Sequence, residues 1–320
     1  MQASGFLHIG NLIGALQNWV KIQEKYDCYF FIADWHALTT NYDHPELIKK
    51  SSNDLILNFL SAGLDPEKCV IFQQSKILQH AELHVLLSMI TPLGWLERVP
   101  TYKEKKAELS DRDLNNYGFL GYPLLQSADI LLYRAKYVPV GIDQVPHLEI
   151  TREIARRFNH LYNTETLIEP EALLTEFPKV VGVDGRKMSK TYDNALYLSD
   201  TPDIIDKKIK TMKTDPARQR RTDKGEPNLS PVFELHKIFS SLDELEFVAN
   251  GCRTAEIGCI DCKKILIKNV LNVLTPIWER REQLLKTWST VEDILVSGNH
   301  KALIKAEETM ELVRADMKMV

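Results

Sequence analysis

The hydrophobic positions in the first half of the chain follow two different periods. Residues 28–34 and 69–75 form short continuous apolar runs, which are typical of buried parallel strands. Residues 12–25, 45–62 and 79–90 repeat their apolar positions every three to four residues, which predicts amphipathic helices. Because strands and helices alternate, the pattern predicts a doubly wound parallel sheet with helices on its faces.

The pattern changes in the second half. A further strand at 138–141 closes on a glycine turn and is followed by a helix, but beyond residue 195 the periodicity is helical without clear strands. The last part, 263–320, predicts two or three long amphipathic helices. We therefore expect an α/β domain at 1–194 and an all-helical domain at 195–320.

The composition excludes several classes of protein. Of the 320 residues, 44% are hydrophobic and 26% are charged, as in ordinary soluble globular proteins. The chain has no run of 18 apolar residues, so we expect no membrane span. Its five irregularly spaced cysteines favour a reducing, cytoplasmic location over a disulfide framework. The net charge of −4 argues against binding nucleic acid over the whole surface. A basic run at 207–224 is either a solvated face or a local contact for RNA phosphates.

Candidate chemistry begins almost at the start of the chain, where Gly5 and Gly10 flank His8 just before the first predicted helix. A helix start offers unpaired N–H groups and the positive end of the macrodipole to an anion such as a triphosphate. His8 and Asn11 can donate to phosphate oxygens, although a cap or turn fits the same pattern. No strand precedes this loop, where a nucleotide-binding α/β unit normally has one, so we expect a short N-terminal segment before Met1.

A second glycine-containing loop, 183–191, carries Lys187 and Lys190 with Ser189 between them. Flexible ammonium groups on a loop suit neutralisation of phosphate charge that develops during a reaction. The alternative interpretation is a solvated surface loop.

The segment 121–133 places Asp129 among apolar residues, with Gln126 and Tyr122 three and seven positions earlier on the same helical face. A buried carboxylate is costly unless something donates to it. Asp129 is therefore either satisfied inside the protein or accepts an N–H or O–H of a ligand in an apolar pocket.

Polar side chains also follow two predicted strands, at the edge where open α/β sheets bind ligands. His36 follows the strand at 28–34, and Asp143 and Gln144 follow the strand at 138–141. Each is either a ligand contact or a turn or N-cap residue.

Seven segments in this order resemble the motifs of bacterial tryptophanyl-tRNA synthetases, which are class I aminoacyl-tRNA synthetases. They are 7–16 (LHIGNLIGAL), 34–39 (DWHALT), 102–105 (YKEK), 121–133, 138–144 (VPVGIDQ), 147–159 (HLEITREIARRFN) and 184–191. The resemblance implies a Rossmann-type catalytic domain at 1–194, a helical anticodon-binding domain at 195–320, and a homodimer.

The resemblance also implies which residues bind which substrate. Residues implied to bind ATP are Gln2, Ala3, Ser4, Gly10, Asn11, Gly141, Ile142, Asp143, Val180, Lys187, Met188, Ser189, Lys190 and Thr191. Residues implied to bind tryptophan are Asp129 (the acceptor for the indole N–H), Tyr122 and Gln144 (for the amino group), Gln126 and His36. The implied catalytic residues are His8, Asn11, Lys187, Ser189 and Lys190. The family commonly has Glu at the position of Ile142, and many members have Met at that of Gln126.

The implied reaction has two steps. The tryptophan carboxylate attacks the α-phosphate of ATP–Mg²⁺, and the terminal ribose hydroxyl of tRNA(Trp) then takes the acyl group. Tyrosine specificity is the nearest alternative, because one carboxylate can accept from an indole N–H or a phenol O–H; segment 147–159 favours tryptophan. A non-catalytic paralogue that senses tryptophan or binds RNA is the second alternative, and the intact signature residues argue against it.

Cys252, Cys259 and Cys262 are spaced C-x6-C-x2-C, which in a cytoplasmic protein suggests metal or cluster ligation over a disulfide. Some tryptophanyl-tRNA synthetases carry a [4Fe–4S] cluster on four cysteines in this region, and the fourth is Ser230 in this chain. A zinc site that includes His236 is the other option. We predict three ordinary thiols, no cluster in the stable protein, and a helical domain that folds without metal.

Overall fold

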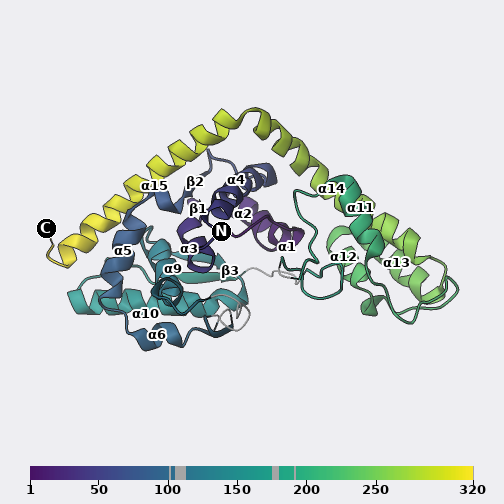
Figure 1. The fold of residues 1–320 in the computed structure, drawn as a ribbon, viewed down its shortest axis with the longest axis horizontal. Coiled ribbons are helices and arrows are strands. Elements are labelled where there is room, and N and C mark those ends of the chain that lie inside the picture. Colours follow the sequence, from purple (N-terminus) through teal and green to yellow (C-terminus); the bar gives the residue numbers. More distant parts are fainter. Residues whose placement is uncertain (101, 105–112, 175–179, 191, 320) are drawn as a thin grey trace.

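The computed structural model describes residues 1–100, 102–104, 113–174, 180–190 and 192–319. Figure 1 shows a body of strands and shorter helices beneath two long helices, α14 and α15, which meet at an angle. No helix in these ranges is long and apolar enough to cross a membrane.

The strands pair in parallel, as the sequence predicts. Strand β1 (Cys28–Ile32) lies beside β2 (Cys69–Gln73), and β3 (Tyr137–Val140) lies beside β4 (Glu171–Leu174). Strands β1 and β2 each end two residues before the predicted limits. The chain turns into a helix at Asp34 and into a 3-10 turn at Gln74.

The first residues of the chain lie beside the end of β1. Gln2 forms a parallel bridge with Ala33, and the Ala33 N–H donates to the Met1 carbonyl at 2.9 Å. Residues 1–3 thus run along the end of β1 and lead directly into the loop that contains His8.

The predicted helices of the first half are present. The helices and 3-10 turns here are α2 (Gln17–Ile22), α3 (Asp34–Asn41), α4 (Pro45–Ala62), η2 (Gln74–Lys76), α5 (Gln79–Ser88), α6 (Leu93–Glu97), α8 (Tyr117–Leu120), α9 (Tyr122–Leu131), η3 (Ile142–Gln144) and α10 (Val145–Tyr162). Helix α4 has the predicted bounds, because Pro45 suits a first helical position and Gly63, with φ of 113°, ends the helix. The helix predicted at 12–25 begins at Ile9 as α1 (Ile9–Asn11), continues through a π-helical turn η1 (Leu12–Leu16), and ends in α2.

Helices dominate the second half. They are α11 (Pro202–Thr211), η4 (Pro227–Leu229), α12 (Pro231–Phe239), α13 (Leu242–Thr254), α14 (Cys259–Lys286) and α15 (Trp288–Asp316). No strand occurs between residue 195 and residue 319, which confirms the predicted helical C-terminal region. Up to residue 319, the predicted segment 263–320 consists mainly of the two long helices α14 and α15, as expected.

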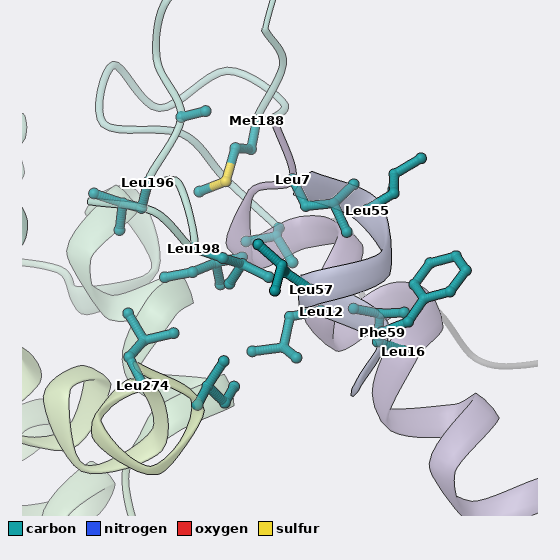
Figure 2. Close-up of a cluster of buried hydrophobic side chains, with 14 of the residues drawn as sticks. Leu7, Leu12, Leu16, Leu55, Leu57, Phe59, Met188, Leu196, Leu198 and Leu274 are labelled. Atoms are coloured by element: carbon teal, nitrogen blue, oxygen red, sulfur yellow. The ribbon is translucent and has the colours of Figure 1, made fainter. Parts of the chain in front are cut away.

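One hydrophobic cluster joins the two halves of the sequence. Figure 2 shows leucines of the first loop and of α4 facing Met188 and Leu274, and the cluster also holds residues of the segment 195–198. At its edge the Arg281 guanidinium on α14 binds the buried Asp54 carboxylate on α4 at 2.6 Å. The loop that contains His8 and the loop that contains Lys187 and Lys190 therefore pack on the same hydrophobic cluster.

Helix α15, the second of the two long helices, packs on β2. Gly298 lies so close that a Cβ there would be 1.8 Å from the Ile71 carbonyl oxygen. Next to it the Asn299 side chain accepts a hydrogen bond of 3.0 Å from the Gln73 N–H. The helix thereby fixes the position of the residues that end β2.

Candidate active site

The fold brings the two distant signature loops together. The Ile9 N–H donates to the Leu196 carbonyl at 2.8 Å, and the Leu198 N–H donates to the Leu7 carbonyl at 2.9 Å. Across this junction the Lys190 ammonium lies 3.1 Å from the Gly5 carbonyl oxygen and 3.3 Å from that of Ser4. Residues 5–11 and 187–190 therefore form one site, as their pairing in the sequence suggests.

His8 is the most perturbed titratable group in this site. Burial, followed by the charges of Lys190 and Lys187, lowers the pKa of His8 to about 4, so the ring is neutral at pH 7. Its Nδ1 atom is buried and has no hydrogen-bond partner among the described residues. The ring lies against Gly10, where a Cβ would come within 2.9 Å of it. The Asn11 side chain accepts a 3.1 Å hydrogen bond from the His8 N–H.

The second signature forms a tight turn that Asn194 holds in place. The Asn194 side chain accepts from the Ser189 N–H at 2.8 Å and donates to the Lys187 carbonyl at 3.1 Å. Gly182 is required beside it, since a Cβ there would lie 2.4 Å from the Asn194 amide. The sequence analysis did not identify Asn194, although a polar residue three positions after a lysine-rich turn was a signal for it.

The side chains of this turn have different environments. Lys187 is exposed, Ser189 and Lys190 are half-buried, and Met188 is buried in the hydrophobic cluster, as is Val180. Contacts of Met188 and Val180 with ATP would therefore be made by the backbone. Thr191 and Lys105, which the resemblance included, lie outside the described residues.

Asp129 lies on α9 and is only 3% exposed. The carboxylate accepts from the Gln74 amide at 2.8 and 2.9 Å and lies 2.7 Å from Nδ1 of His80. Gln74 accepts in turn from the His36 N–H at 3.1 Å. Asp129 therefore has internal partners, and the sequence analysis missed both Gln74 and His80.

The other residues implied for tryptophan are divided between two places. Tyr122 is buried on α9, 3.3 Å from Nε2 of His147, and its ring meets that of His36 edge-on with centroids 5.5 Å apart. Gln126 is half-buried on the same helix. Gln144 lies at the end of η3 and donates to Asp143 at 3.1 Å. The preceding residues, from Gly141 to Asp143, follow β3 at the surface, and Ile142 is 83% exposed.

At the start of the chain, the residues implied for ATP line the entrance to the first loop. Ala3 is buried beside β1, Ser4 is exposed, and the Gln2 amide donates to the Thr40 hydroxyl at 3.4 Å. These residues lie next to Lys190 through the carbonyls of Ser4 and Gly5.

The three cysteines predicted to be ordinary thiols lie at the junction of α13 and α14. Cys262 is 3.4 Å from Nε2 of His236, and the Arg218 guanidinium donates to Cys252 at 3.7 Å. Burial, with smaller effects of Cys252 and Cys259, raises the pKa of Cys262 to about 12. Within the described ranges no three or more His, Cys, Asp or Glu side chains are arranged to hold a metal ion. Ser230 is buried at the start of α12. The absence of a cluster stays a prediction.

Two small parallel sheets, a histidine–glycine loop at the first helix and a lysine loop joined to it are the features of a class I aminoacyl-tRNA synthetase. The family model described as "tRNA synthetases class I (W and Y)" matches residues 1–275. The chain belongs to this family.

Individual relatives match over nearly their whole length. The tryptophan–tRNA ligase of Thermotoga maritima is 52% identical over 322 residues, which cover 100% of this chain and 98% of the relative. That of Ralstonia nicotianae is 42% identical, with 99% of this chain and 96% of the relative covered. The solved tryptophanyl-tRNA synthetase of Campylobacter jejuni, complexed with ADP and tryptophan, superimposes with a TM-score of 0.90 at 35% identity, covering 99% of this chain and 98% of that one.

Proposed function

We propose that the chain activates L-tryptophan with ATP and transfers it to tRNA(Trp), releasing AMP and pyrophosphate. The observation that carries the proposal is the 52% identity to a tryptophan–tRNA ligase over the whole chain. The joined signature loops support it, because they bring His8 and Lys190 together at a candidate phosphate site. The relatives favour tryptophan over the tyrosine alternative, and the complete loops favour an enzyme over a non-catalytic paralogue.

The phosphate side of the site uses the junction of the two loops. His8, which stays neutral, has an unpartnered Nδ1 that can bond to ATP, and Asn11 fixes the loop around it. Lys190 is held by two carbonyl oxygens, and burial lowers its pKa while Asp54 raises it. An ammonium held in this way can move onto the phosphates as negative charge develops on pyrophosphate, together with Lys187.

The remaining ATP contacts come from three segments. They are residues 2–4, which lead into the first loop, Gly141, Ile142 and Asp143, which follow β3, and the signature turn from Val180 to Ser189. Because Ile142 replaces the family's usual Glu, its contact with the ribose would be made by the backbone. Magnesium enters with ATP as part of the substrate, and its charge assists the leaving pyrophosphate.

The tryptophan side uses α9 and the segments around it. Asp129 would accept the indole N–H, while Tyr122 and Gln144 would bind the amino group and Gln126 and His36 would line the pocket. No side chain forms a covalent bond to the substrate. The rate comes from orienting the carboxylate against the α-phosphate and from stabilising charge.

We assign the catalytic part to residues 1–194 and the tRNA-binding part to residues 195–320, working in the cytoplasm as a homodimer. Of the basic run at 207–224, Lys208 binds Asp200 and Arg218 turns inward to Cys252. Lys210 pairs with Asp206 at 2.7 Å. The exposed members left to contact RNA phosphates are Lys207, Lys213, Arg220, Arg221 and Lys224.

Charging of tRNA tests the complete function. The purified chain is incubated with ATP, Mg²⁺, radiolabelled tryptophan and tRNA(Trp) transcript, and acid-precipitable label is counted. We expect label to accumulate until the tRNA is fully charged. Tryptophan that binds without ever reaching tRNA would favour the non-catalytic paralogue.

A further inference from the structure

A buried hydrogen-bonded chain lies behind Asp129. His80 on α5 approaches Asp129 through Nδ1 at 2.7 Å and the Tyr133 hydroxyl through Nε2 at 2.9 Å. The three side chains are 0%, 3% and 7% exposed for His80, Asp129 and Tyr133. The mechanism of adenylate formation uses neither His80 nor Tyr133.

The direction of the two hydrogen bonds follows from their chemistry. A carboxylate only accepts hydrogen bonds, so Nδ1 of His80, 2.7 Å from Asp129, carries a proton that it donates. Burial, with a smaller effect of Asp129, raises the pKa of Tyr133, so its hydroxyl keeps its proton and can donate to Nε2 of His80. A neutral imidazole that accepts at Nε2 carries its proton on Nδ1. Nδ1 therefore donates to the Asp129 carboxylate, and Tyr133 fixes the tautomer that makes this possible.

Gln74 holds the carboxylate from a second side. Its carbonyl oxygen accepts from the His36 N–H at 3.1 Å, which turns its amide nitrogen toward Asp129. Oδ1 of Asp129 therefore accepts from both Gln74 and His80, whereas Oδ2 accepts from Gln74 alone in the described part of the chain. Since each carboxylate oxygen has two lone pairs, Oδ2 keeps one acceptor direction open for a ligand.

Aromatic rings surround the chain of hydrogen bonds. The rings of Phe31 and Phe72 lie 5.9 and 6.1 Å from that of His80, and Phe72 lies 5.2 Å from the ring of Tyr133. Water cannot readily replace a lost donor in such surroundings, so each donor counts for the position of the carboxylate.

We propose that His80 and Tyr133 are positioning residues for amino-acid selection: they orient Asp129 so that its Oδ2 faces the indole N–H of tryptophan. This inference rests on the proposed function, in which Asp129 accepts that N–H. Neither residue touches the substrate; both act through the carboxylate.

The test compares two ligands of nearly the same shape. L-β-(3-benzothienyl)alanine has sulfur where tryptophan has the indole N–H, so the ratio of the two dissociation constants reports the hydrogen bond to Asp129. Because a bond to a charged acceptor is at stake, we expect the parent protein to prefer tryptophan by roughly tenfold or more in calorimetric titrations. Asp129→Asn should bring the two ligands to within about threefold.

Four variants separate positioning from packing. Tyr133→Phe and His80→Gln should also lose most of the preference for tryptophan. The first removes the hydroxyl that fixes the tautomer of His80, and the second removes the hydrogen bond from Nδ1 of His80 to Oδ1 of Asp129. His80→Asn keeps an amide donor close to the position of Nδ1 and should retain more of the preference than His80→Gln. Tyr29→Phe is the matched control, because the Tyr29 ring stacks on Tyr133 at 5.0 Å without joining the hydrogen-bonded chain.

The outcomes are distinct. A preference that falls in Tyr133→Phe and His80→Gln, and not in Tyr29→Phe, supports the inference. If binding of both ligands weakened equally, so that the ratio of the dissociation constants stayed unchanged, the two residues would have a structural role only and the inference would be wrong. If Tyr133→Phe does not fold, His80→Gln and His80→Asn decide between these outcomes. If the preference for tryptophan persisted in these variants and also in Asp129→Asn, Asp129 would not be the acceptor for the indole N–H. A parent protein that binds neither ligand would instead contradict the proposed function.

Discussion

Replacing Gly298 with Ala tests how α15 holds the end of β2. The new Cβ would lie 1.8 Å from the Ile71 carbonyl oxygen and 2.8 Å from its carbon, both backbone atoms that cannot rotate away. Helix and strand must therefore separate by more than an ångström. That movement strains the 3.0 Å hydrogen bond from the Gln73 N–H to Asn299.

The expected size follows from three opposing terms. Overpacking of this kind costs about 1–3 kcal/mol, and the strained hydrogen bond adds about 1 kcal/mol. Ala in a helix interior gains back about 1 kcal/mol relative to Gly. The free energy of unfolding should thus fall by about 1–3 kcal/mol, which lowers the Tm by a few degrees, since about 2–4 °C per kcal/mol is typical of somewhat smaller domains.

The assay is thermal unfolding followed by circular dichroism, with Gly94→Ala as the matched control. Gly94 lies in α6 and a Cβ there meets nothing within 4 Å, so this variant should unfold at the same temperature or higher. The tryptophan KM should rise in Gly298→Ala as well, because Gln74 follows β2 directly and holds Asp129. Equal stability of the two variants would refute this account of the packing of α15.

Three further predictions concern the active site. Asp129→Asn should raise the tryptophan KM roughly 10- to 150-fold with the ATP KM unchanged; an unchanged tryptophan KM in steady-state exchange would remove Asp129 from the pocket. Lys190→Ala should lower kcat by roughly the same factor with little change in the tryptophan KM; a variant that only raised KM would contradict the role given to Lys190. The pKa of His8 lies near 4 in the folded protein, below 6.5, so protonation favours the unfolded chain and stability falls as pH drops from 6.5 to 4. His8→Asn should flatten that part of the pH–stability curve in urea titrations, and an unchanged slope would argue against a buried neutral ring.

Much of the fold follows from local pattern. The continuous apolar runs at β1 and β2 and the capped, amphipathic α4 each specify one element without help from distant residues, and the structure has them almost at the predicted limits. Strand β4 was not predicted, because Glu171–Leu174 is too short and too exposed to show a period. The pairing of residues 1–3 with the end of β1 depends on a tertiary contact with Ala33, which no local pattern encodes.

The site shows the same division. The two signature loops were visible because their residue types and spacing are unusual, and the resemblance supplied their pairing. The partners of Asp129 were not visible, since Gln74 and His80 lie 55 and 49 positions away and look like ordinary polar residues at the ends of elements. A buried carboxylate indicates that donors must exist, but only the tertiary contacts with α9, from η2 for Gln74 and from α5 for His80, identify them.

Amino-acid-dependent exchange of pyrophosphate into ATP tests the central claim most directly, since it isolates adenylate formation from tRNA. The purified chain is incubated with ATP, Mg²⁺ and labelled pyrophosphate, with tryptophan, tyrosine or no amino acid. We predict rapid labelling of ATP with tryptophan and only background labelling with tyrosine. Labelling driven by tyrosine and not by tryptophan, or by neither, would contradict the assignment of this site to tryptophan activation.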